Sequence, residues 1–442
     1  MSDEFNASRL IDLILSGDIS EAQQRLTKQS SIVESDFYLA CATGHHHHVA
    51  RLLAEEESLA TRLGGPRGWE PLLYTCHSRF LGHDGEIANR LVQVARCLLD
   101  HGANPNAYFK INDDPNAKQT CLYGAAGIAN HAAMTQLLLE AGADPNDGAP
   151  GLGPESLYHA SEFADTTCLK LILAAKPAPQ KVSYCLRRKL DFHHSTEGVR
   201  LFLEHGADPN DIVPGRHDGT PFHAAIRRLQ NVSVLEALHQ FGADLTLQTP
   251  SGHTPYALAV RLGHDAAADF CLVQGAREEE ASLVDQVIGH CMNGRESAAR
   301  QLVASLDAFQ QHLALHDHAV VAEAAMHGRL EAVQPLLHLG FRIDVANDTN
   351  QMQPLHWAGW QGNHRLVELL LQFSPPLEPV NRYGGTPLDA AVYGFTHCPT
   401  AQGDYLITIQ RLLDAGCDAN RVTPYPTGRP EIDSLVGPYR SE

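Results

Sequence analysis

The chain has 442 residues, 43% of them hydrophobic, and carries 33 Lys and Arg against 52 Asp and Glu. That apolar content is typical of a folded protein rather than a disordered one. The formal net charge of −19 argues against general binding to nucleic acids or to anionic membrane surfaces. The ten cysteines form no C-x-x-C motif and mostly stand within apolar helical patterns, which is typical of buried thiols in a reducing compartment.

The N-terminal residues open acidic, and Asp12 interrupts their only apolar run, so they do not have the pattern of a signal peptide. Nothing later reaches the roughly 18 uninterrupted apolar residues that would predict a membrane span. We therefore expect a soluble, cytoplasmic protein.

Pairs of short amphipathic helices are predicted from the start of the chain. Residues 5–30 give one pair, RLIDLILSGD followed by SEAQQRLTK. Residues 36–59 give a second pair, FYLACATGH followed by VARLLAEEE. In a third pair, PLLYTC and VQVARCLL are separated by an insertion near 77–91, which we expect to be a loop because stacked helices leave no interior room for it.

A recurring phrase then ends each helix pair: a Leu-rich run, Gly-Ala, an acidic or amide residue and a polar loop. It stands at Gly102, Gly142, Gly206, Gly242, Gly275 and Gly416, with a looser copy at Gly340, at intervals of 40, 64, 36, 33, 65 and 76 residues. The three long intervals each have room for two units, so each predicts a hidden degenerate repeat. These repeats read ESLYHASEFADTTCLKLIL, SLVDQVIGHCMNGRESAARQLVAS and QPLHWAGWQGNHRLVELLLQFSPP.

Each residue of the phrase has a physical role. Thr220 and Thr254 stand where a hydroxyl can accept from the free N–H groups of a helix start. Pro255 follows at the first helical position, where no N–H is needed. Gly242 ends a helix where a left-handed residue is favoured. The unit resembles the ankyrin repeat, which has a period of about 33 residues and a T-P-L-H motif.

This resemblance implies an all-α, ankyrin-repeat solenoid of about twelve helix-turn-helix repeats with loop or hairpin connections. We expect an N-terminal capping repeat at 1–33, a repeat array at 34–422 and a C-terminal capping tail at 423–442. A second insertion is expected near 394–404, and the repeat signature is weakest at 277–317. The resemblance also implies that His223 and His356, in the T-P-L-H position, form hydrogen bonds between neighbouring loops.

The sequence shows few signs of catalysis or metal binding. It lacks G-x-S-x-G, G-x-x-x-x-G-K-[ST] and H-E-x-x-H motifs. The run His45-His46-His47-His48 could be a metal site, but consecutive side chains fan out around a helix, so only His45 and His48 could converge. The alternative to a metal site is that this run forms the start of a helix. We expect no cofactor and no metal.

The resemblance places variable side chains of each first helix on an inner face that binds partners. Large aromatic and Arg side chains there are typical of interface hot spots. The segment 176–261 also carries ten Lys and Arg against eight Asp and Glu, which indicates either a solvated face or a stripe for an acidic partner. The candidate contact residues are Tyr74, His77, His159, Glu162, Arg227, Arg228, Arg261, Met326, Trp357, Trp360 and Tyr393.

Trp360 lies off the apolar stripe of its predicted helix, and we expect Arg261 and Tyr393 at the same position of other repeats to line one groove with it. We therefore predict a non-enzymatic, monomeric scaffold or adaptor that binds another protein, with no nucleic acid or membrane partner. Two alternatives stay open. One is an inhibitory regulator of a partner enzyme, and the other is a metal-binding or enzymatic protein that uses the insertions and histidines.

Overall fold

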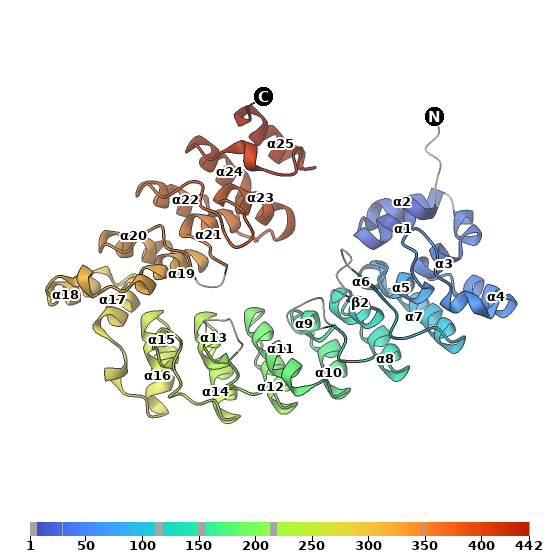
Figure 1. Cartoon of the computed structure of the whole chain (residues 1–442), viewed down its shortest axis with the longest axis horizontal. Coiled ribbons are helices and arrows are strands. Elements are labelled where there is room, and N and C mark those ends of the chain that lie inside the picture. The colour runs from blue at the N-terminus through green and yellow to red at the C-terminus, as the bar shows by residue number, and fades with distance from the viewer. Residues whose placement is uncertain are drawn as a thin grey trace. The chain divides into compact units, whose positions relative to one another are not determined.

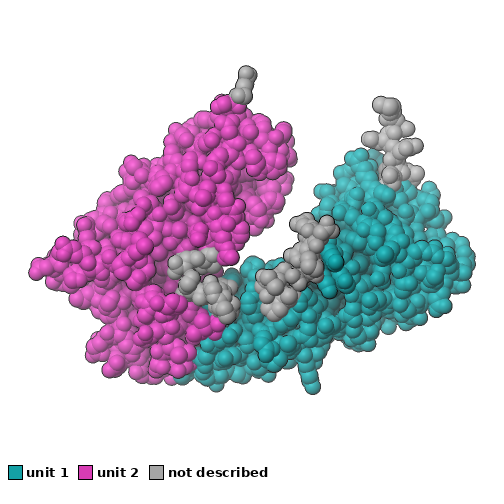
Figure 2. Space-filling model, in the orientation of Figure 1, with its two compact units in different colours: residues 1–211, 233–243 teal, residues 212–232, 244–442 magenta. Residues whose placement is uncertain are grey.

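A computed structural model describes residues 7–28, 30–110, 118–148, 156–212, 219–347 and 350–441. The chain divides into two compact units (Figure 2). Unit 1 comprises residues up to 211 together with 233–243, and unit 2 comprises 212–232 together with 244–442. The division thus falls near 212–244, and the weak repeat signature at 277–317 lies wholly inside unit 2.

Unit 1 is built from successive pairs of short helices and one small hairpin (Figure 1). In the hairpin, β1 pairs with β2 antiparallel, with Phe109 opposite Gln119. The elements are α1 (Ala7–Ser16), α2 (Ile19–Lys28), η1 (Ser30–Ser35), α3 (Phe37–Thr43), α4 (His46–Glu55), η2 (Glu57–Thr61), α5 (Pro71–Cys76), α6 (Phe80–His83), α7 (Gly85–Asp100), β1 (Tyr108–Lys110), β2 (Lys118–Thr120), η3 (Tyr123–Ile128), α8 (Ala132–Glu140), α9 (Ser156–Ala160), α10 (Thr167–Ala174), α11 (Pro179–Asp191), α12 (Thr196–Glu204) and α14 (Val232–Gln240), the last from Ser233 onward.

Unit 2 repeats the same pattern and ends on an extra short helix, α25, which packs against α24. Its elements are α13 (Pro221–Arg227), α15 (Pro255–Arg261), α16 (Asp265–Val273), η4 (Glu278–Glu280), α17 (Leu283–Met292), α18 (Glu296–Ala304), η5 (Phe309–His312), η6 (Leu315–Ala319), α19 (Val320–Met326), α20 (Leu330–His338), α21 (Pro354–Trp360), α22 (His364–Leu371), α23 (Pro387–His397), α24 (Tyr405–Asp414), η7 (Ala419–Arg421), α25 (Pro430–Val436) and η8 (Gly437–Tyr439). Counted in chain order, the described elements form twelve helix pairs.

The two insertions depart from the prediction that they form loops. Residues 77–91 include α6, and α7 begins at Gly85, where the Asp84 carboxylate accepts from the Glu86 and Ile87 N–H groups. The second insertion, near 394–404, begins inside α23, which continues to His397. Extra helical turns satisfy backbone hydrogen bonds that a long loop would leave to water, and the N-cap at Asp84 specifies where α7 starts.

Left-handed glycines and polar caps set the ends of the helices. Gly242 has φ +93°, and a Cβ at this position would meet nothing within 4 Å, so the backbone angle alone favours glycine there. The Thr254 hydroxyl accepts from the Ala257 N–H at 3.3 Å, as predicted. At Thr220 the His223 ring accepts from the Thr220 N–H at 3.2 Å, which makes His223 the reciprocal partner of a capping box at the start of α13.

The predicted histidine bonds between loops are confirmed in unit 2. His223 Nε2 lies 3.2 Å from the His253 carbonyl, and His356 Nε2 lies 3.1 Å from the Gly385 carbonyl. Each Nδ1 accepts at the same time from the N–H of its own helix start, which leaves Nε2 protonated and ready to donate. Each imidazole therefore joins the start of its own first helix to the loop of the next repeat.

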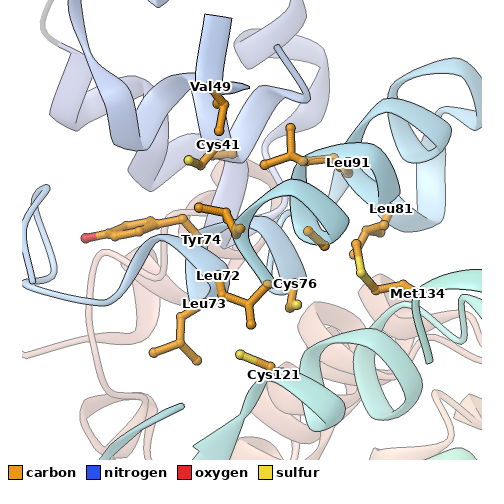
Figure 3. Close-up of a cluster of buried hydrophobic side chains, with 14 of the residues drawn as sticks. Cys41, Val49, Leu72, Leu73, Tyr74, Cys76, Leu81, Leu91, Cys121 and Met134 are labelled. Atoms are coloured by element: carbon orange, nitrogen blue, oxygen red, sulfur yellow. The ribbon is translucent and has the colours of Figure 1, made fainter. Parts of the chain in front are cut away.

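The core of unit 1 is a continuous set of small and branched apolar side chains from neighbouring pairs (Figure 3). Ala40, Ala42 and Ala125 have no exposed surface, which lets the backbones of first helices approach closely. All ten cysteines are free thiols and eight are buried, as the sequence predicted for most of them, whereas Cys398 is exposed. The core side chains labelled in Figure 3 are Cys41, Val49, Leu72, Leu73, Tyr74, Cys76, Leu81, Leu91, Cys121 and Met134.

Candidate functional site

Three of the predicted contact residues are buried, which corrects their expected role. Tyr74, His77 and Arg261 expose 0%, 5% and 4% of their surface. The Tyr74 hydroxyl donates to the Gly64 carbonyl at 2.8 Å and so ties α5 to the preceding loop. His77 Nε2 lies 2.9 Å from the Thr120 carbonyl. Buried side chains with satisfied polar atoms stabilise the fold and offer a partner little surface.

Arg261 lies in a buried charge cluster of unit 2 rather than in a groove with Trp360 and Tyr393. Its Nη1 contacts Asp285 Oδ1 at 3.0 Å and Asp317 Oδ1 at 2.8 Å. Burial alone would raise the pKa of Asp285, but the hydrogen bond from His253 and the charge of Arg261 outweigh burial and hold that pKa below its usual range. The arginine therefore joins α15 to two carboxylates of the weak stretch 277–317.

The basic segment 176–261 is not a continuous surface stripe for an acidic partner. Lys181, Arg187 and Lys189 are buried within unit 1. Lys181 Nζ donates to the carbonyls of three consecutive loop residues, the first of them Asn146 at 2.7 Å, and Lys189 Nζ donates to the Phe163 carbonyl at 2.8 Å. These ammonium groups satisfy backbone carbonyls of neighbouring repeats, so their charge serves the packing of the repeats.

Aromatic rings of unit 1 form an unbroken ladder across successive repeats. Neighbouring ring centroids along it lie 3.9 to 6.2 Å apart, so each ring is in contact with the next. The tightest pair is Trp69 and Phe109, stacked at 3.9 Å with an interplanar angle of 15°. The ladder consists of Phe37, Tyr38, Tyr74, Trp69, Phe109, His77, Tyr123, His159, Tyr158 and Tyr184.

One end of the ladder carries two of the predicted contact residues, His159 and Glu162, which are partly exposed. Glu162 Oε1 accepts from Arg188 Nε at 2.7 Å, and Glu162 Oε2 lies 3.3 Å from His159 Nδ1. The Arg188 guanidinium also lies over the Tyr158 ring, 4.7 Å from its centroid. These contacts neutralise the charge of the carboxylate and hold the rings of neighbouring repeats in place.

The middle of the ladder lines a pocket of about 440 Å³, here called the Trp69 pocket. Its apolar side is formed by Trp69, His77, Phe109 and Tyr123, and its remaining lining by Leu15, Ser16, Arg67, Arg79, Gln119, Gly127 and Ile128. Burial lowers the pKa of His77 to about 4, so the imidazole is neutral at pH 7. The pocket thus offers uncharged aromatic surface beside two guanidinium groups.

The helix on one side of this pocket is unusual. Residues 123–128 (η3) form a π-helix, a rare conformation that is often found at functional sites. A Cβ on Gly124 would lie 2.6 Å from the Cys76 carbonyl oxygen, so only glycine allows η3 to approach α5 this closely. That approach brings the Tyr123 and His77 rings to 6.2 Å.

Sequence reasoning missed Trp69, Arg79 and Phe109 as functional candidates. All three stand outside the first-helix positions from which the candidates were drawn: Trp69 precedes α5, Arg79 follows it, and Phe109 is in β1. The loop motif RGWEP, with a tryptophan between charged residues, was the one available signal. Contact between these side chains depends on the packing of neighbouring repeats.

In unit 2, four predicted residues lie around α19. Arg227 forms an ion pair with Glu323, and Arg228 Nη1 lies 3.8 Å from the Met326 sulfur. The fourth, Trp357, is half-buried, and its Nε1 has no acceptor among the described residues. Because Arg227 is paired and Trp357 is partly packed, these four residues offer a partner less free surface than the sequence analysis expected.

Trp360 and Tyr393 do lie side by side, as expected for one shared groove. Their rings stack at 5.3 Å with an interplanar angle of 21°, and the His397 ring lies 4.4 Å from Tyr393. Tyr393 is 50% exposed and Trp360 is half-buried. We call these three residues the Trp360 stack. It leaves aromatic surface in contact with solvent along two neighbouring first helices, α21 and α23.

The histidine run 45–48 occupies the start of α4, the alternative role considered for it. Its members make different contacts: His45 Nδ1 lies 2.8 Å from the Thr43 hydroxyl, and His48 Nδ1 lies 3.2 Å from Arg51. Within the described ranges, no group of three or more His, Cys, Asp or Glu side chains is arranged to hold a metal ion. In the same ranges no helix has the length and apolarity to cross a membrane.

Comparisons with known proteins identify the repeats. A family model for three consecutive ankyrin repeats matches residues 321–423, and a single-repeat model matches residues 118–148. The chain is 28% identical over 200 residues to human SH3 and multiple ankyrin repeat domains protein 2. It is 29% identical over 141 residues to the Drosophila melanogaster transient receptor potential channel pyrexia, and 30% identical over 106 residues to a putative ankyrin repeat protein of Rickettsia felis.

These matches cover 44%, 29% and 21% of this chain, but only 10%, 14% and 46% of the three relatives. The chain therefore spans less than half the length of each. Among solved structures, the human ASB11 ankyrin repeat domain is 22% identical and is matched over 52% of this chain and 96% of its own, with a TM-score of 0.24. The T-P-L-H histidines, the twelve helix pairs and both family models agree that this chain contains ankyrin repeats.

Proposed function

We propose that this protein is a non-enzymatic scaffold or adaptor that binds another protein through side chains at the ends of its first helices. Ankyrin repeats are in general protein-interaction modules, and the Trp360 stack supports this function in the present chain. Stacked aromatic side chains that remain half-exposed are typical of interface hot spots, since they bring a large contact area and lose little conformational entropy on binding.

We further propose that the protein is cytoplasmic and monomeric and binds neither nucleic acid nor membranes. The free state of all ten cysteines supports the cytoplasmic location, and the net charge of −19 supports the exclusion of nucleic acid and membranes. An inhibitor of a partner enzyme would use the same kind of surface, so it is a special case of this proposal. No observation favours a metal-dependent or enzymatic activity.

The proposal is tested by quantitative affinity capture with the immobilised full-length chain, followed by a binding titration with each captured protein. Trp360→Ala should weaken binding by about 2 kcal/mol, or roughly 30-fold in Kd, as truncation of a hot-spot residue does. Tyr383→Ala is the matched control because Tyr383 is 77% exposed in a loop of the same unit. Thermal melting of each variant separates loss of binding from loss of folding.

Two outcomes would count against a binding role for the stack. One is equal binding by Trp360→Ala and the wild-type protein. The other is a loss of affinity no larger than that of Tyr383→Ala. A large drop in melting temperature without a specific loss of binding would make Trp360 a packing residue.

A further inference from the structure

The Trp69 pocket in unit 1 has a chemistry of its own. One side is apolar, because the Trp69 and Phe109 rings stack there and the neutral His77 ring meets Phe109 edge-on at 5.1 Å. The Tyr123 ring completes this side. Its volume of about 440 Å³ lies within the usual range for ligand sites, and an uncharged aromatic wall favours an apolar or aromatic group.

The other side carries positive charge. Arg79 lines the pocket, and its Nε donates to the carbonyl of Leu15, another lining residue, at 3.3 Å. Among the described residues, no carboxylate lies within ion-pair distance of Arg79, and its Nη atoms have no acceptor. Arg67 is half-exposed and pairs with Asp12 at 2.8 Å. In a chain with 19 more acidic than basic residues, an arginine that has no carboxylate partner within the described part of the chain and lies beside an aromatic pocket is a specific feature.

Arginine suits a carboxylate better than other ligands of this size. Its planar fork can donate two parallel hydrogen bonds to the two oxygens of one carboxylate, and such charge-assisted bonds are short and strong. The adjoining rings exclude water from one side, which strengthens the pairing. A polyanion such as RNA is a poorer fit, because the net charge of −19 repels a chain of phosphates.

We propose that the Trp69 pocket binds an acidic segment of a partner protein, in which an aromatic or leucine side chain contacts Trp69 and Phe109 and a neighbouring Asp or Glu carboxylate pairs with Arg79. This inference rests on the proposed protein-binding function, but it concerns a surface separate from the Trp360 stack. It assigns a ligand class to residues that belong to loops, a strand and a π-helix of unit 1.

The chain itself supplies a reporter. It has three tryptophans, so a full-length variant with Trp357→Phe and Trp360→Phe retains Trp69 alone. The probes are synthetic octapeptides with a Phe-Glu-Glu or Leu-Glu-Glu core, each with one twin in which Gln replaces Glu and another in which Ser replaces the apolar residue. Peptides are titrated up to about 1 mM while Trp69 fluorescence is recorded.

We expect a saturable change in Trp69 fluorescence with the acidic peptides. The Gln twins should bind roughly tenfold more weakly or worse, because they lose a charge-assisted hydrogen bond. Arg79→Gln should weaken binding of the acidic peptides by a similar factor and remove their advantage over the Gln twins. Arg96→Gln makes the same change of charge on an exposed face of α7 and should leave the titration unchanged.

A second variant guards against misfolding of Arg79→Gln. Gln119 lines the pocket from β2, and Gln119→Glu places a carboxylate there while Arg79 remains, so it should also weaken binding of the acidic peptides. The proposal is overturned if the acidic peptides produce no saturable change, if the Gln twins bind equally well, or if Arg79→Gln and Arg96→Gln behave alike. Stronger binding of a uridine decamer than of any peptide would also overturn it, in favour of nucleic acid.

The two binding proposals fail separately. The peptide titration is carried out without Trp360, so a positive result shows that the pocket works independently of the Trp360 stack. A negative titration combined with loss of captured partners in Trp360→Ala would overturn the pocket alone. A positive titration combined with unchanged capture by Trp360→Ala would instead remove the Trp360 stack from the function.

Discussion

Arg261 offers the sharpest test of how the stretch 277–317 is joined to the repeat before it. The side chains of Arg261, Asp285 and Asp317 expose only 5%, 5% and 8% of their surface, so replacing the arginine leaves two buried carboxylates without their cation. Removing one partner from a buried ion pair costs about 3–5 kcal/mol, mostly through the charge left behind. We expect Arg261→Met to destabilise unit 2 by an amount in this range at pH 7.

A matched variant isolates the charge from the packing. In the triple variant Arg261→Met, Asp285→Asn, Asp317→Asn, no charge of the cluster remains, and it should recover more than half of the loss. Recovery should be incomplete. The oxygen of each asparagine amide can still accept a hydrogen bond, as Asp285 Oδ2 does from Ser282 Oγ at 2.6 Å and Asp317 Oδ2 does from the Ala314 N–H at 2.7 Å. The NH2 group of each amide, however, replaces an oxygen that accepted from Arg261.

The effect of pH has a definite sign. The folded-state pKa of Asp285 is lowered, so the wild-type protein gains stability from this carboxylate above the unfolded pKa of about 4 and loses it as pH falls through the folded pKa. Without Arg261, the carboxylate loses one of the groups that lower its pKa, so the pKa of Asp285 should rise from its value in the wild-type protein. The cost of Arg261→Met should therefore be largest at neutral pH and shrink in acid.

The assay is urea unfolding of the full chain in a Trp69→Phe background, in which Trp357 and Trp360 both report on unit 2. The free energy of unfolding is measured for the wild-type, single and triple variants at pH 7 and in mild acid. A loss below about 1 kcal/mol for Arg261→Met would refute the buried-cluster reasoning. So would equal losses in the single and triple variants.

Two further predictions concern unit 1. Gly242→Ala should destabilise the protein by about 1–2 kcal/mol, because φ is +93° at this position. Gly85→Ala is the matched control, since Gly85 is the first residue of α7 and an added Cβ would also meet open space there. This substitution should stabilise the protein by about 0.5–1 kcal/mol. Urea titrations giving the same sign for both glycines would contradict this. Because burial lowers the pKa of His77 to about 4, the unfolded chain takes up the proton first, so stability should fall between pH 6.5 and 4 by at most about 3 kcal/mol. The melting temperature of His77→Gln should therefore depend less steeply on pH between 6.5 and 4 than that of the wild-type protein. An unchanged dependence on pH would exclude His77 as a contributor.

The sequence by itself determined most of the helix pairs and the type of repeat, because these depend on residues close together in the chain. The left-handed angle at Gly242 and the N-cap at Thr254 follow from the chemistry of one turn. The period of the phrase also located the degenerate pair α17 and α18, with Gly294 left-handed between the two helices. The resemblance to ankyrin repeats added the loop-bridging bonds of His223 and His356.

Only the tertiary structure decided which side chains are free to bind. Arg261 and Trp360 stand at equivalent positions of their helices, yet Arg261 is buried against Asp317, 56 residues away, and Trp360 stacks on half-exposed Tyr393. Tyr123 and His77 meet at the Trp69 pocket because η3 approaches α5 through Gly124, and Arg79 and Phe109 line the same pocket from other parts of the chain. Such contacts depend on how each repeat packs on its neighbour, and helical periodicity within one repeat carries no information about a partner that lies one repeat or more away.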